Sequence, residues 1–135
     1  MDAHVHAPGL PPSVCEAPGR AVNVGILGAF VGAAVDGCFA CQLVLMDDLV
    51  ADSVTTARLV ELACISLDRV FGGLPWSALD DREAGPASLE FRRLARAGLS
   101  DGGAVYRECA LMTHDERREA TYTAVDSLVA AIDMA

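Results

Sequence analysis

Cys38 and Cys41 are separated by two residues, and a Cys-x-x-Cys pair can exchange disulfides or bind a metal ion. If a helix begins at the pair, its free backbone amides favour the thiolate of the first cysteine, which makes that sulfur nucleophilic. The apolar residues 43–45 follow the pair, so no histidine lies close in sequence to shuttle protons. The pair therefore defines one candidate function, that of an all-α thiol-redox or metal-binding protein.

Further cysteines and a histidine could complete a metal site with this pair. Cys15 and Cys64 could supply two more thiolates, and Cys109 or His114 could replace one of them. Such a set would hold zinc or an iron–sulfur cluster, although its spacing matches no established pattern for either. Because free cysteine is among the most buried residue types, packing is the alternative interpretation of all five.

The N-terminus offers a second group of metal-binding side chains. Asp2, His4 and His6 repeat the Asp-x-His-x-His spacing that metal-dependent amidohydrolases place at the first strand of a large barrel. Such a barrel needs about 250 residues, and this chain has 135. We therefore interpret the match as chance, although the histidine pair could still bind a metal ion.

Residues 21–46, which contain the cysteine pair, are mostly small or apolar and have helical spacing. One stripe of such a helix holds Gly25, Gly28, Gly32 and Asp36. A membrane span is one interpretation, because about 20 residues suffice, but Asp36 near its centre would cost about 3 kcal/mol. A dinucleotide-binding turn is another, but the spacing from Gly28 to Gly32 does not fit Gly-x-Gly-x-x-Gly. We favour a packed helix, broken or bent at Gly37, whose glycines let a neighbouring backbone approach closely.

The rest of the chain predicts further helices and no strand. Helical patterns cover residues 53–71, 88–98, 101–111 and 113–132. Asp52 or Ser53 can cap the first of these, and Gly72 can end it. Thr113 and Glu116 form a capping box at the start of the last.

These elements predict an all-α fold, a single-domain bundle of roughly five helices over residues 20–135. Residues 1–19 contain four of the six prolines, so we expect an extended N-terminal arm. Hydrophobic residues make up 53% of the chain, a share that favours burial between subunits and hence a homo-oligomer, most simply a homodimer.

The net charge and the number of cysteines limit which partners and which cellular compartment are expected. The formal net charge is -9, so phosphate backbones and anionic lipids are repelled and nucleic-acid binding is not expected. The cysteine count is odd and no basic, apolar leader is present, which favours a reducing, cytoplasmic location.

No motif identifies a catalytic class, so the sequence favours a small acidic protein–protein interaction module over an enzyme, without a cofactor. The module would be regulatory, adaptor-like or chaperone-like. Its best-motivated partner contacts are the only basic cluster and the lone tryptophan: Arg92, Arg93, Arg96 and Trp76.

Two alternatives remain open. The first is the thiol or metal protein, which would use Cys38 and Cys41, joined by Cys64, and hold zinc or an iron–sulfur cluster. The second is a membrane-associated helical protein that inserts residues 21–46.

Overall fold

The computed structural model describes residues 6–74 and 87–134, and all regular structure within these ranges is helical. The helices are α1 (Pro12–Cys15), α2 (Val24–Val35), α3 (Phe39–Ala51), α4 (Ser53–Phe71), α5 (Leu89–Ser100), α6 (Ala104–Leu111) and α7 (His114–Met134). The predicted all-α fold is confirmed. The described residues hold two helices more than predicted, because residues 21–46 divide into α2 and α3 and the arm contains α1.

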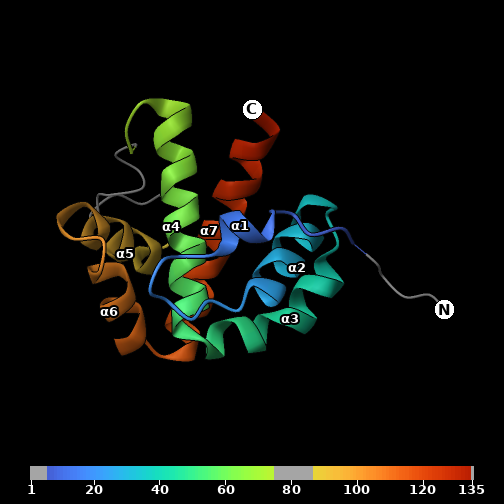
Figure 1. Ribbon diagram of the computed structural model, residues 1–135, viewed down its shortest axis with the longest axis horizontal. Coiled ribbons are helices and arrows are strands. Elements are labelled where there is room, and N and C mark those ends of the chain that lie inside the picture. Colours follow the sequence, from blue (N-terminus) through green and yellow to red (C-terminus); the bar gives the residue numbers. More distant parts are fainter. Residues whose placement is uncertain (1–5, 75–86, 135) are drawn as a thin grey trace.

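The two longest helices, α4 and α7, pack against each other at the centre of the molecule (Figure 1). On one side α5 and α6 contact them, and on the other side α2 and α3 do. The central contact is apolar, since Leu59 and Val60 of α4 and Ala124 and Leu128 of α7 are all buried. Burial of these two faces supplies the main hydrophobic stabilisation of the bundle.

Local sequence signals set the helix ends as predicted. The Thr55 amide donates a hydrogen bond of 3.1 Å to Asp52 Oδ1, and Gly72 ends α4 in a left-handed conformation with φ 71°. At α7 the Thr113 amide donates to Glu116 Oε1 over 2.9 Å, and the Glu116 amide donates to Thr113 Oγ1 over 3.1 Å. Both hydrogen bonds of the predicted capping box are therefore formed.

Not every predicted boundary is correct, since α6 begins at Ala104 and not at residue 101. Helix α5 does not end at Gly98 but continues to Ser100. A Cβ at Gly98 would lie 3.0 Å from Val105 Cγ2 of α6, so this glycine allows two helices to pack closely and does not mark a helix end.

A tight turn at Gly37 separates α2 from α3. Gly37 has φ +70°, which a residue with a side chain rarely adopts. Its amide donates to Ala34 O, and the Cys38 amide donates to Ala33 O, so the turn closes the end of α2 and starts α3 at the cysteine pair. Within the described residues no helix is long and apolar enough to cross a membrane. A single helix over residues 21–46, which the alternative of a membrane span required, is not formed.

The arm crosses the backbone of α2 at unusually close range. The Gly9 amide donates a hydrogen bond of 3.0 Å to Gly28 O. A Cβ on Gly32 would fall on the Ala7 carbonyl oxygen, and a Cβ on Gly9 would lie 2.6 Å from the Gly32 amide nitrogen. The packed-helix interpretation of the glycine stripe is thus correct, and the approaching backbone belongs to the arm.

Helix α1 anchors the arm at its other end and corrects the prediction of a wholly extended segment. Pro12 occupies the first helical position, where its missing amide hydrogen costs nothing. Cys15 is fully buried. Arg58 of α4 donates to the carbonyl oxygens of Val14, over 2.9 Å, and Cys15, over 3.3 Å, which fixes the end of α1.

Candidate functional site

The arm brings His6 to the start of α3, beside Cys38 and Cys41. One ligand atom from each of these three residues lies within 4.8 Å of the other two. All three residues are half-buried. Within residues 6–74 and 87–134, no other group of three His, Cys, Asp or Glu side chains converges in this way. The structure therefore joins two groups that the sequence analysis treated separately.

Asp36 holds the imidazole of His6. His6 Nδ1 lies 2.6 Å from Asp36 Oδ2, and Asp36 is the residue that follows α2. This hydrogen bond is the main cause that raises the pKa of His6 above its usual value, and the hydrogen bond with Cys38 adds to it. A carboxylate thus orients the ring on one side, while the ring faces a thiol on the other.

Cys38 and Cys41 differ in their surroundings. Cys38 is the N-cap residue of α3, and Cys41 lies in the first turn of that helix. The free amides of this turn and a protonated His6 both favour negative charge on the Cys38 sulfur. The hydrogen bond with Cys38, followed by burial, raises the pKa of Cys41. These contacts therefore favour loss of the proton from Cys38 over loss of the proton from Cys41.

An apolar cavity of about 240 Å³ opens beside the site. Apart from His6 and Cys41, its walls are the apolar side chains of Ala29, Ala33, Val44 and Leu45. The outer surface of α3 next to it is also apolar, since Phe39 is 59% exposed and Val44 77%. A reactant that approaches the thiols thus meets apolar surface on two sides.

The other three cysteines are placed for packing. Cys15 and Cys109 are buried, and burial raises the pKa of both thiols, that of Cys109 to about 11. Burial also raises the pKa of Cys64 to about 12. All five cysteines are free thiols. Among the described residues, Cys38 and Cys41 are the only two that form a group of three with a histidine.

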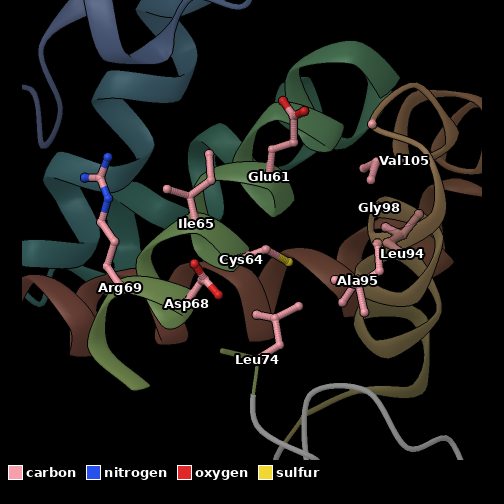
Figure 2. A pocket seen from close by; sticks show the side chains of 12 residues that line it. Glu61, Cys64, Ile65, Asp68, Arg69, Leu74, Leu94, Ala95, Gly98 and Val105 are labelled. Atoms are coloured by element: carbon pink, nitrogen blue, oxygen red, sulfur yellow. The ribbon is translucent and has the colours of Figure 1, made fainter. Parts of the chain in front are cut away.

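Cys64 lines a different cavity, of about 410 Å³, between α4 and α5 (Figure 2). Its sulfur points across this cavity towards Leu94 and Ala95 of α5. Glu61 and Asp68 are the acidic groups on the α4 wall. The structure therefore does not bring Cys64 to the cysteine pair, as the predicted four-thiolate site required.

The predicted partner-binding residues lie in different environments. Arg93 and Arg96 are exposed on α5, whereas Arg92 is only 7% exposed and its Nε donates to Ser88 O over 3.4 Å. Arg93 Nη1 lies 3.9 Å from Glu116 Oε2. Trp76 lies outside the described residues, as do Asp2 and His4. His114 is the exposed first residue of α7.

The sequence patterns did not predict that His6 and Asp36 lie beside the cysteine pair. The sequence holds one sign of this contact, which is a glycine in each of the two segments, Gly9 in the arm and Gly32 in α2. A side chain at either position would collide with the backbone of the other segment. No family model matches the chain, and no curated protein or solved structure matches it either. The assignment of a function therefore rests on the geometry of this site.

Proposed function

We propose that Cys38 and Cys41 form a dithiol–disulfide centre that exchanges electrons with other thiols and disulfides. The observation that carries the proposal is the convergence of His6 with a Cys-x-x-Cys pair at a helix start, within 4.8 Å. A pair used only for packing would not need a histidine held by a carboxylate, and in the described part of the chain no such group forms at the three remaining cysteines. This favours the thiol alternative of the sequence analysis over a module without chemistry.

In the proposed reaction the Cys38 thiolate attacks one sulfur of a substrate disulfide. A Cys38–substrate bond forms, the substrate S–S bond breaks, and the other half leaves as a thiolate. Cys41 then loses its proton and attacks the Cys38 sulfur, which closes the protein disulfide and releases the second substrate thiolate. His6 lies where it can hold the proton of Cys38 and give it to the first leaving thiolate, and then take the proton of Cys41 and give it to the second. One substrate disulfide is reduced to two thiols as the protein dithiol is oxidised.

The test is reaction of the reduced full chain with an aromatic disulfide whose released thiolate is coloured. We expect one fast phase that releases two aromatic thiolates and leaves no adduct, since the pair closes. The Cys41→Ser chain should release one and retain a mixed disulfide at Cys38, visible in the intact mass. Cys38→Ser should lose the fast phase, and His6→Gln should slow it by about tenfold or more.

Cys64→Ser is the matched control, because Cys64 is half-buried like the pair but its pKa is raised to about 12. This variant should react like the unmodified chain. A fast phase that survives Cys38→Ser, or that disappears in Cys64→Ser, would contradict the proposal.

A second candidate is the predicted homodimer, in which a second copy of the chain is the partner. The exposed apolar side chains of α3 favour it: Phe39, Leu43 and Val44 are 59%, 48% and 77% exposed. Burial of such a face between two copies would stabilise a homodimer. One variant distinguishes the two functions. Cys38→Ser should abolish disulfide exchange, whereas light scattering should still give the molar mass of a dimer.

A further inference from the structure

We infer that in the reduced protein His6, Cys38 and Cys41 bind one soft divalent cation of the Zn²⁺ type. This goes beyond disulfide exchange, because a cation could bind the dithiol whether or not the pair ever becomes oxidised. The three residues come from two segments, the arm and the start of α3, so the cation would also tie the arm to the bundle.

The spacing of the ligand atoms fits such a cation. Zinc binds sulfur at about 2.3 Å and histidine nitrogen at about 2.0–2.1 Å, so neighbouring ligand atoms of a tetrahedral site lie about 3.5–3.8 Å apart. The three atoms already lie within 4.8 Å of one another. An inward shift of about 1 Å by half-buried side chains would therefore complete the geometry.

Asp36 provides the outer contact that metal-binding histidines usually have. Its Oδ2 lies 2.6 Å from His6 Nδ1, which leaves Nε2 as the coordinating nitrogen. A carboxylate in this position fixes the ring and increases its basicity, and its loss typically lowers metal affinity 10–100-fold.

The donor set selects the type of cation. Two thiolates and a neutral imidazole compensate a double positive charge and suit zinc, whereas magnesium and calcium prefer oxygen ligands. An iron–sulfur cluster needs more thiolates, and Cys15, Cys64 and Cys109 are placed elsewhere in the fold. Three protein ligands leave a fourth position for water or a small molecule, as in catalytic zinc sites. Two of the three ligand residues, His6 and Cys41, also line the apolar cavity of about 240 Å³.

The test is titration of the reduced full chain with Zn²⁺ against a chromophoric chelator, and with Co²⁺ followed by absorption. We expect one equivalent to bind, with thiolate-to-cobalt charge transfer and the intense visible bands of tetrahedral coordination. Cys38→Ser and Cys41→Ser should each abolish the charge-transfer signal of a two-thiolate site. His6→Ala should weaken zinc binding by about 100-fold or more, and Asp36→Asn by about 10–100-fold.

Cys64→Ser and His114→Ala are controls that remove a thiol or an imidazole elsewhere, and both should bind zinc as the unmodified chain does. Absence of stoichiometric binding, or zinc affinity that His6→Ala leaves unchanged, would overturn the inference. The Cys41→Ser chain distinguishes this inference from the proposed exchange reaction. It should no longer bind the cation, but it should still form a mixed disulfide at Cys38.

Discussion

Gly32→Ala is expected to release the arm from α2 and to remove His6 from the cysteine pair, although no residue of the site is substituted. The added Cβ would fall on the Ala7 carbonyl oxygen and lie 3.1 Å from the Gly9 amide nitrogen. Both are backbone atoms, which cannot rotate away as a side chain can, so the arm must move. We expect a loss of about 2 kcal/mol in unfolding free energy, the usual cost of overpacking. Disulfide exchange should slow as in His6→Gln.

Gly25→Ala is the matched control on the same helix. Gly25 is exposed, and a Cβ there would meet only Asn23 Oδ1, at 3.6 Å. Alanine has the higher helix propensity, so this variant should gain up to about 1 kcal/mol. Urea unfolding and limited proteolysis of the arm would measure both effects. Equal behaviour of the two variants would mean that the glycine contact does not hold the arm.

Arg117→Ala is expected to have the largest effect on stability, about 3 kcal/mol or more. The Arg117 side chain is buried, with the residue 8% exposed. Its guanidinium donates to Cys109 O over 2.8 Å, to Val50 O over 2.9 Å and to Ala110 O over 3.2 Å. It therefore joins α7 to the carboxyl ends of α3 and α6, where a cation is favoured and carbonyl oxygens need donors. Truncation leaves these carbonyls buried without their donors.

Arg118→Ala is the control one position along. Arg118 reaches Asp47 over 2.9 Å at the surface, and the Asp47 side chain is 82% exposed. Exposed pairs of this kind contribute about 0–1 kcal/mol, so thermal and urea unfolding should change little. Arg117→Lys should restore less than half of the loss, because an ammonium group lacks the planar fork that reaches three carbonyls. A loss below about 1 kcal/mol for Arg117→Ala would contradict the capping role.

The features that the sequence predicted well are those that depend on neighbouring residues. The Asp52 cap, the left-handed Gly72 and the reciprocal Thr113–Glu116 hydrogen bonds each involve residues within one turn of a helix. Their chemistry is complete in a short window of sequence, so no knowledge of the fold is needed. The helical character of the chain followed for the same reason.

The candidate site depends on contacts that no short window contains. His6 reaches Asp36 only because the arm lies across α2. In the same way Arg92 and Arg117 look like surface arginines in the sequence, but the fold buries both. Only tertiary packing decides whether a charged side chain is solvated or satisfied by carbonyl oxygens. The cysteine pair was predicted as a candidate, but its histidine comes from a separate segment of the chain and was not assigned to it.

The most direct test of a centre built from His6, Cys38 and Cys41 is its redox equilibrium. The full chain would be equilibrated in buffers of graded glutathione ratio, quenched with acid, alkylated and mapped by peptide mass spectrometry. We predict one reversible two-electron transition, with a single disulfide between Cys38 and Cys41 and with Cys15, Cys64 and Cys109 reduced throughout. A pair that stays reduced at every ratio, or a disulfide that involves one of the other three cysteines, would contradict the account.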